Sequence, residues 1–379
     1  MVLVRSLSLL VLALSPFVSA ETIRPTKPVG TPHYRDYFYV GGQYVSQSGG
    51  TAQIQHGQLY VEHLTPSSGV TKKYPLLFVH GAGMTGTNFL NTPDGRLGWA
   101  DWFLGQGYEV YLVDQPARGR SAYQSAVDGP QFSFSNEVVQ SLFTSPAITK
   151  LWPQSILHTQ WPGLGAVGDA VFDKFFASLV PLLATNVESA TKNKAALTAL
   201  VDKIGPVHLV THSQSGEFGW NLADARPNLI RSIVGLEPAG PPFAGDATFP
   251  SNTSRLWGLT DIPITYSPPL SSPDALNKDK ILVNDPVADN FPCYAQSPPI
   301  RTLPNLAQVP VLVVTSESGW HVISDWCMVR YMREAGMKRV EHVKLGEVGI
   351  KGNGHMFFME KNNIEIVSKV VGPWVAGKN

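Results

Sequence analysis

The chain has 379 residues, 43% of them hydrophobic, and its 29 basic side chains balance 29 acidic ones. This length and composition suit one large domain with insertions or two domains. The neutral balance gives no support to a nucleic-acid or acidic-surface partner, because such binding needs a concentrated positive field.

The first twenty residues have the pattern of a secretory signal peptide. Arg5 supplies the positive charge, residues 7–17 form a short apolar stretch, and residues 18–20 (VSA) match a cleavage site. We therefore predict that residues 1–20 are a signal peptide and that the protein is secreted. A membrane anchor is the alternative, although the stretch is short for a bilayer span, and no later segment is apolar enough to span one.

Segments with strand character alternate with helical segments along the rest of the chain. Residues 37–45 and 53–63 are predicted to form an antiparallel pair. Continuous apolar strands are expected at residues 75–79, 108–113, 207–210, 232–236, 311–314 and 340–345, with helices at 97–104 and 217–225. This alternation predicts an α/β fold whose mostly parallel sheet is covered by helices, with functional residues at the carboxyl ends of strands.

Two long segments, at about residues 121–168 and 238–308, interrupt the alternation. The first is rich in Phe and Trp, and the second is rich in Pro. Segments of this length without regular structure are usually lids or pocket walls, and we prefer that interpretation to passive padding. We therefore expect a single domain over residues 21–379 that carries these two insertions.

Two modifications are predicted from single residues. The chain has two cysteines, Cys293 and Cys327, which in a secreted protein are expected to form a disulfide; two separate buried thiols are the alternative. Asn252 begins an Asn-Thr-Ser sequon and is the expected glycosylation site.

The motif that carries most chemical information is Thr-His-Ser-Gln-Ser-Gly at residues 211–216. It follows a predicted buried strand and precedes a predicted helix, which is the setting of the nucleophile elbow of serine hydrolases. The usual G-x-S-x-G pattern is replaced by small residues, Thr211 and Ser215, on either side of Ser213. We predict that Ser213 is the nucleophile and that the backbone N–H of Gln214 stabilises an oxyanion.

A serine nucleophile needs a histidine base, and His355 is the candidate that we favour. It follows Gly352, Asn353 and Gly354 after the last predicted strand, in a loop that can approach the elbow. Among the alternatives, His342 lies within a predicted strand. His321 lies too early in the chain for the base but is well placed to line a pocket.

The histidine in turn needs an acid, and residue type alone leaves two glutamates open. Glu237 follows the strand at 232–236, and Glu317 follows the strand at 311–314. Asp325 is a weaker third candidate. A carboxylate that ends an apolar strand, as Glu237 does, needs a buried partner.

The second oxyanion donor is expected in the His-Gly-Ala-Gly turn at residues 80–83, with Ala82 preferred and Gly83 next. Asp114 follows the neighbouring strand and is expected to be structural, pairing with Arg118 or Arg120. No metal-ligand motif and no nucleotide-binding motif is present in the sequence, so we predict neither a metal nor a cofactor.

With these motifs in place, the chain resembles the α/β-hydrolase superfamily over residues 50–379. Four segments resemble a small group of secreted bacterial and fungal esterases: residues 80–86, 92–99, 113–121 and 211–216. In that group the acid is a glutamate after the sixth strand, at the spacing of Glu237 from Ser213. The resemblance implies Glu237 as the acid, and Ala82 and Gln214 as oxyanion donors.

The chain also departs from that group. The characterised bacterial esterase of that group has adjacent cysteines where this chain has Ala82 and Gly83. The rigidity of the oxyanion loop must therefore have another origin here. The insertion at 238–308 also looks longer. Because this insertion is expected to roof the pocket, the substrate preference of the relative is not carried over.

The sequence therefore predicts a secreted, cofactor-independent hydrolase that cleaves carboxylic esters through a Ser-His-Glu triad and an acyl-enzyme. Its partner would be a small ester or lactone, with no nucleic acid and no membrane span; the oligomeric state stays open, a dimer among the options. A lactonase, amidase or acyltransferase with the same triad is the first rival. A non-catalytic binding protein is disfavoured, because Ser213, Glu237 and His355 are all present.

Overall fold

The computed structural model describes residues 30–47, 49–245, 254–283, 291 and 293–378. The chain divides into two compact units, Met1–Gly30 and Thr31–Asn379, and the second contains every element named below. The predicted signal peptide and the predicted glycosylation site Asn252 lie outside the described residues.

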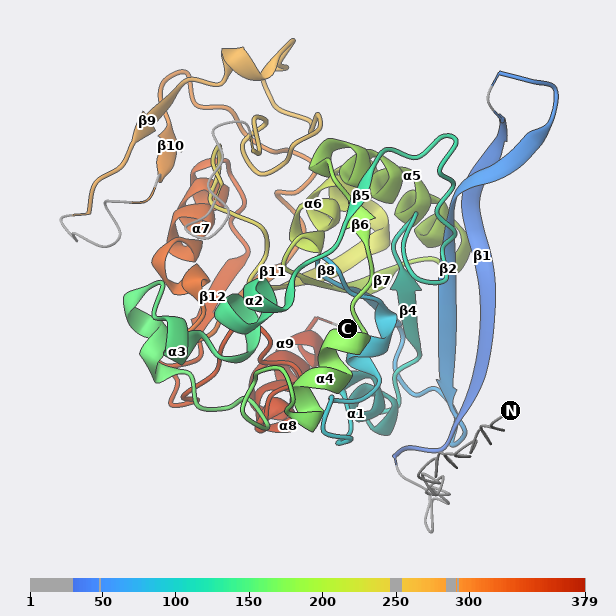
Figure 1. Cartoon of the computed structure of the whole chain (residues 1–379). Coiled ribbons are helices and arrows are strands. Elements are labelled where there is room, and N and C mark those ends of the chain that lie inside the picture. Colours follow the sequence, from blue (N-terminus) through green and yellow to red (C-terminus); the bar gives the residue numbers. More distant parts are fainter. Residues whose placement is uncertain (1–29, 48, 246–253, 284–290, 292, 379) are drawn as a thin grey trace, which may run out of the picture. The chain divides into compact units, whose positions relative to one another are not determined.

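An eight-stranded sheet forms the centre of this unit, in the order β1-β2-β4-β3-β7-β8-β11-β12 (Figure 1). The strands are β1 (His33–Ser46), β2 (Gln53–Pro66), β3 (Leu76–Val79), β4 (Val110–Asp114), β7 (Val207–His212), β8 (Ile230–Leu236), β11 (Val311–Thr315) and β12 (Val340–Lys344). The first two strands pair antiparallel, and β2 runs antiparallel to β4. All other neighbours are parallel, which confirms the predicted mostly parallel sheet.

Helices cover both faces of the sheet (Figure 1). They include α1 (Trp99–Gly105), α5 (Asn186–Ile204), α6 (Ser215–Ala225), α7 (Asp325–Glu334), α8 (Asn363–Ile366) and α9 (Gly372–Ala376). One apolar core joins the sheet to α5, α6 and α7, and a second joins it to α1, α8 and α9. The parallel strands β3, β4 and β7 are buried throughout, because helices pack on both of their faces.

The two predicted insertions contain short elements. The first contains β5 (Gln131–Phe132), α2 (Asn136–Val139) and α3 (Pro146–Thr149), and it continues through α4 (Ala170–Ala177) to β6 (Leu182–Leu183), which pairs with β5. The second contains β9 (Lys278–Lys280) paired with β10 (Tyr294–Gln296). Further short helical turns are η1 (Gly86–Phe89), η2 (Gln140–Thr144), η3 (Pro153–Leu157), η4 (Pro227–Leu229), η5 (Pro273–Ala275), η7 (Trp320–Ile323) and η8 (Val367–Val371).

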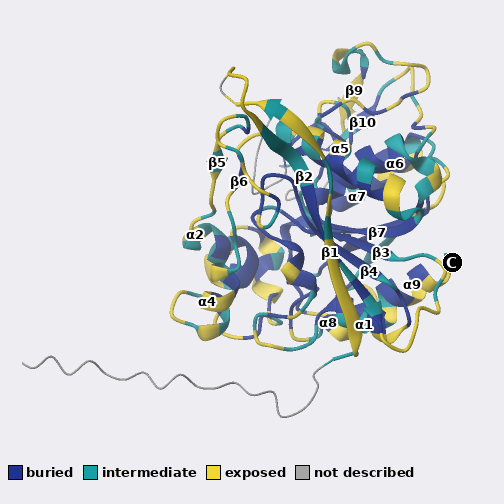
Figure 2. Cartoon of the chain, turned by 90° about the vertical axis from the view of Figure 1, so that its right-hand side faces the viewer, coloured by how far each residue is buried: buried dark blue, intermediate teal, exposed yellow. Residues whose placement is uncertain are grey.

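Burial decreases toward the edge of the sheet that β1 forms (Figure 2). Most of β1 is exposed, whereas the second half of β2, which adjoins β4, is mostly buried. Within the residues that the structure describes, none of the helices combines the length and the apolar character that a membrane crossing requires. The buried carboxyl ends of the central strands are therefore where a protected reaction site can form.

Candidate active site

Ser213 occupies a sharp turn between β7 and α6. Its backbone φ is +52°, a left-handed conformation that is uncommon outside glycine and that marks a functional constraint. The turn needs small neighbours: a Cβ on Gly216 would lie 2.2 Å from Cβ of Pro238, and the Ser215 hydroxyl donates to the Val79 carbonyl at 2.7 Å. The predicted strand–turn–helix context of the serine is therefore present.

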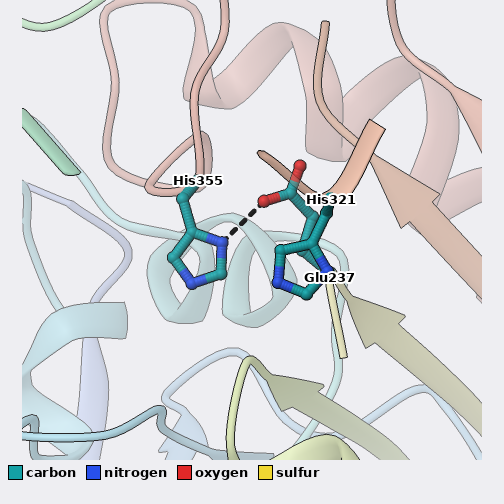
Figure 3. Close-up of side chains that lie close together, drawn as sticks. All are labelled: Glu237, His321 and His355. Atoms are coloured by element: carbon teal, nitrogen blue, oxygen red, sulfur yellow. Dashed lines mark hydrogen bonds and ion pairs between the residues drawn. The ribbon is translucent and has the colours of Figure 1, made fainter. Parts of the chain in front are cut away.

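Glu237 lies directly after β8 and is fully buried. Its Oε1 accepts hydrogen bonds from the backbone N–H and the hydroxyl of Ser316, at 2.8 and 2.5 Å. Its Oε2 lies 2.6 Å from Nδ1 of His355 (Figure 3). The structure thus joins a carboxylate and an imidazole that are 118 residues apart in the chain.

The loop that carries His355 is held against the nucleophile turn. Nε2 of His212, the residue before Ser213, donates to the His355 carbonyl at 3.1 Å. Burial lowers the pKa of His212 well below its ordinary value, and the nearby His355 adds to this effect, so His212 stays a neutral donor. The rings of Trp320 and Phe143 pack on the His355 ring, at centroid distances of 4.2 and 5.6 Å. These contacts fix the orientation of the imidazole.

The alternative acids and histidines have other partners. Glu317 accepts hydrogen bonds from the Gly352 N–H at 2.7 Å and from Nζ of Lys351 at 2.9 Å, so it supports the loop without contacting His355. Asp325 accepts from Nδ1 of His321 at 2.8 Å. Of the three candidate carboxylates, Glu237 is the one that the structure brings to His355.

Sequence reasoning missed Glu360, which organises the histidine loop. Its carboxylate accepts from the Gly354 N–H at 3.1 Å and from Nδ2 of Asn353 at 2.8 Å. It also lies 2.7 Å from Nε2 of His158 in the first insertion. Glu360 is fully buried, and four residues separate it from His355, so only its place in the folded chain reveals this role.

A cavity of about 240 Å³ opens at the carboxyl edge of the sheet. Ser213, Gln214 and Ala82 line it together, as expected for a nucleophile and two oxyanion donors. The insertions supply further wall residues, among them Phe132 and Phe134 from the first and Ser254, Arg255 and Asp261 from the second. Trp320 and His321 complete the wall next to His355.

A second buried carboxylate, Glu217 in the first turn of α6, lies near the same cavity. Its oxygens accept hydrogen bonds from Nδ2 of Asn186 at 2.5 Å and from the Asp261 N–H at 2.6 Å. The same Asn186 nitrogen donates to Oδ2 of Asp261 at 2.5 Å. Burial and the neighbouring Asp261 charge raise the pKa of Glu217 well above its ordinary value.

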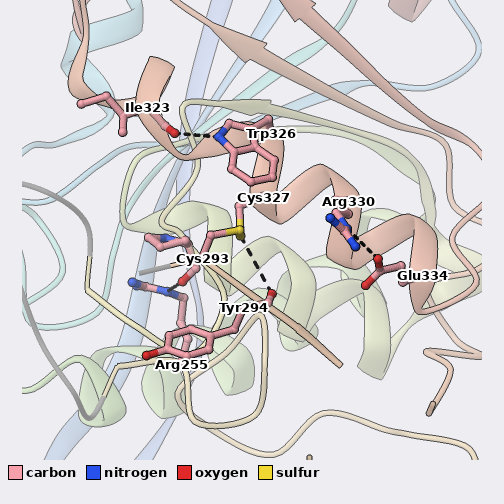
Figure 4. Close-up of a disulfide and its surroundings, with 9 residues drawn as sticks. Arg255, Cys293, Tyr294, Ile323, Trp326, Cys327, Arg330 and Glu334 are labelled. Atoms are coloured by element: carbon pink, nitrogen blue, oxygen red, sulfur yellow. Dashed lines mark hydrogen bonds and ion pairs between the residues drawn. A yellow bond between two sulfur atoms is a disulfide. The ribbon is translucent and has the colours of Figure 1, made fainter. Parts of the chain in front are cut away.

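Two further sequence predictions concern structural residues. Asp114 accepts from the Gly86 N–H at 2.9 Å and from Nε of Arg120 at 2.8 Å, so Arg120, rather than Arg118, is its partner. The predicted disulfide between Cys293 and Cys327 is formed and connects the second insertion to α7 (Figure 4).

One group of side chains could in principle hold a metal ion. Ligand atoms of Glu237, His321 and His355 lie within 4.8 Å of one another (Figure 3). The 2.6 Å separation of Glu237 Oε2 and His355 Nδ1 does not fit an ion between them, because each metal–ligand bond alone is about 2.0–2.2 Å. The arrangement fits a hydrogen-bonded acid–base pair.

Comparisons with known proteins provide separate evidence on the family and the fold of the chain. The model of the "Alpha/beta hydrolase family" matches residues 76–368. The chain is 46% identical over 340 residues to a "Probable secreted lipase phiG" of Fungal sp. (strain ATCC 74256), covering 89% of this chain and 88% of the relative. This likeness confirms the predicted secretion. A solved structure titled "The Atomic Resolution Structure of a Novel Bacterial Esterase" aligns with 93% of this chain and 98% of its own, with a TM-score of 0.59 and 20% identity, which supports the fold.

Proposed function

Because the chain belongs to the alpha/beta hydrolase family, we propose that it cleaves carboxylic esters through Ser213, His355 and Glu237. The observation that carries this proposal is the buried hydrogen bond between Glu237 and His355, next to the strained turn of Ser213. The fungal relative is named a lipase, which supports an ester as the substrate class.

In this mechanism, His355 accepts the hydroxyl proton of Ser213 while the serine oxygen attacks the ester carbonyl. The backbone N–H groups of Ala82 and Gln214 stabilise the negative oxygen that forms. His355 then gives the proton to the leaving alcohol, and the acyl-enzyme remains. Water activated by His355 attacks the acyl-enzyme, releases the acid and regenerates the serine.

Glu237 has two tasks in this scheme. It accepts a hydrogen bond from the protonated Nδ1 of His355, which leaves Nε2 as the basic nitrogen. Its negative charge also stabilises the imidazolium that forms in each half-reaction. The two bonds from Ser316 hold this carboxylate in place while the charge on the histidine changes.

We also propose that both insertions form the walls of the substrate cavity in a single domain. Phe132, Phe134 and Trp320 give one part of the cavity an aromatic lining. Such a lining favours an apolar acyl or alcohol group, because its burial removes apolar surface from water.

Replacement of the nucleophile tests the proposal. S213A should lower the hydrolysis of p-nitrophenyl butyrate by at least about 10⁴-fold, since the acyl-enzyme can no longer form. It should also abolish labelling by a fluorophosphonate probe. S368A is the matched control, because the Ser368 hydroxyl only donates to the Glu365 carbonyl in the closing segment. If S213A, folded as judged by circular dichroism, keeps activity near that of the wild type, the proposal is wrong.

A further inference from the structure

We propose that Arg118 is a positioning residue that sets the direction of both oxyanion donors, Ala82 and Gln214. This inference rests on the function proposed above. Arg118 is 3% exposed, and its guanidinium lies between the loop after β3 and the turn before α6. One planar side chain therefore joins the two loops that carry the donors.

The first contact acts on the Ala82 donor. Nη1 of Arg118 donates to the Gly81 carbonyl at 3.0 Å. This carbonyl and the Ala82 N–H belong to one peptide group, and in a trans peptide they point in opposite directions. Fixing the carbonyl on one side therefore fixes the direction of the N–H on the other. A charged donor on the carbonyl also polarises the peptide and strengthens the N–H as a donor.

A second donor holds the same carbonyl. The Gln115 N–H donates to Nε2 of His80 at 3.1 Å, so the proton of the neutral ring is on Nδ1, which lies 2.9 Å from the Gly81 oxygen. Burial lowers the pKa of His80 to about 3, which keeps the ring neutral. The Gly81–Ala82 peptide is thus held by Arg118 and His80 in a loop that contains no cysteine.

The second contact acts on the Gln214 donor. Nη2 of Arg118 donates to Oε1 of Gln214 at 3.2 Å, and Nε2 of Gln214 donates to Oδ1 of Asn186 at 3.0 Å. The side-chain amide of Gln214 is therefore held through both its oxygen and its nitrogen. Because this residue directly follows Ser213 and lines the cavity, holding its side chain limits rotation of the Ser213–Gln214 peptide, which carries the proposed donor N–H.

Arginine is suited to this task where lysine is not. Its guanidinium presents five N–H donors in a rigid plane, so one group can reach two acceptors in different loops. Burial lowers the pKa of Arg118 to about 9, which still leaves the side chain charged at neutral pH. A lysine would provide one compact charge and could not hold both acceptors in the same geometry.

The test compares R118K and R118M with the wild-type enzyme. We expect kcat for p-nitrophenyl butyrate to fall by about 10- to 100-fold with KM changed by less than about twofold, because the donors act on the transition state. Binding of an alkyl boronic acid, which forms a tetrahedral adduct, should weaken by the same factor as kcat/KM. Binding of butyrate, a product without the tetrahedral oxyanion, should change by less than about twofold.

R120K is the matched control, because Arg120 lies in the same turn but bonds Asp114 and Glu62. Its kcat per active site and its boronic-acid affinity should stay near the wild-type values. The fraction of folded enzyme is measured by fluorophosphonate titration, so that a loss of folding is not counted as a loss of rate. Should R118M fail to fold, R118K carries the test alone.

A double variant adds an independent measurement. If Arg118 acts partly through the Gln214 side chain, R118M combined with Q214M should lose less activity than the product of the two single losses. Multiplicative losses, or R118 variants with unchanged boronic-acid affinity, would overturn the inference. Neither result would touch the proposed function, which has its own test in the dependence of hydrolysis on Ser213.

Discussion

Glu237 and Glu217 are both fully buried near one cavity, yet their surroundings differ. Glu237 faces the imidazole of His355 and two donor groups of Ser316. Glu217 faces a second carboxylate, that of Asp261, and shares the donor Asn186 with it. The first setting suits a carboxylate that stays charged, and the second favours the protonated acid.

This difference shows that burial alone does not make a carboxylate functional. In the proposed mechanism, one fully buried glutamate, Glu237, supports the catalytic base, whereas the other, Glu217, joins α6 to the second insertion. What decides between the two roles is whether a base or an acid lies opposite.

E237Q should lower kcat by about 10³- to 10⁴-fold, the size expected when a histidine base loses its orienting acid. A glutamine amide that turns its NH₂ toward His355 makes Nδ1 an acceptor, which moves the proton to Nε2 and removes the base. In the opposite orientation the NH₂ group faces the N–H and hydroxyl of Ser316, so that donors face one another without an acceptor. The measurement is steady-state hydrolysis of p-nitrophenyl butyrate.

E317Q is the matched control for this variant, because Glu317 ends a neighbouring strand but contacts Gly352 and Lys351. It should keep most of the wild-type kcat. A loss in E317Q as large as that in E237Q would contradict the assignment of the acid and return Glu317 to that role.

Glu360 is a third buried carboxylate, and it supports the loop of His355 through Asn353 and Gly354 rather than through the ring. E360Q should lower kcat by roughly tenfold, because small displacements of a catalytic group cost rate. The amide has one acceptor oxygen and cannot satisfy Gly354, Asn353 and His158 together. E365Q, at a half-exposed position paired with Lys369, should match the wild type. An E360Q enzyme with wild-type kcat would show that the loop needs no such support.

E217Q should leave kcat nearly unchanged and alter stability only as the pH rises. Because folding raises the pKa of Glu217, its protonated form stabilises the fold, and this stability is lost as pH rises through the raised pKa. The glutamine amide stays neutral at every pH. Wild type and variant should therefore have similar free energies of unfolding near pH 4, and the variant should become the more stable of the two toward pH 9.

Urea unfolding across this pH range measures the effect. Each unit by which the pKa is raised corresponds to about 1.4 kcal/mol in the difference between the two proteins. A difference in unfolding free energy that is constant with pH would show that Glu217 does not titrate in this way.

Much of the fold and the nucleophile turn could be predicted from sequence, because local patterns carry them. A buried strand requires apolar residues, and the turn at Ser213 requires small neighbours, whichever distant residues pack against them. The predicted strand at 108–113 begins at Val110, since Tyr108 belongs to the turn after α1. The choice between Glu237 and Glu317 could not be made from residue type, because both follow a strand at the same edge and only tertiary contacts separate them.

Other contacts lay beyond sequence reasoning for the same reason. An acidic residue in the first turn of a helix, such as Glu217, ordinarily interacts with the helix dipole on the surface. It is buried here because Asp261, in the second insertion, lies against it. Arg118 was one of the two partners expected for Asp114, but Arg120 takes that place and Arg118 reaches the Gly81 carbonyl instead.

The contact between His158 and Glu360 has a practical consequence for protein engineering. A designer who grafts a different first insertion to broaden the range of accepted esters also removes the partner of Glu360. The backbone N–H groups of Thr159 and Gln160, which donate to the Gly352 carbonyl at 2.9 and 3.1 Å, would also be displaced wherever the new segment follows a different path. Chimaeras that retain residues 158–160 from this chain should therefore keep turnover, while those that replace them should lose it even where the new segment fits the substrate.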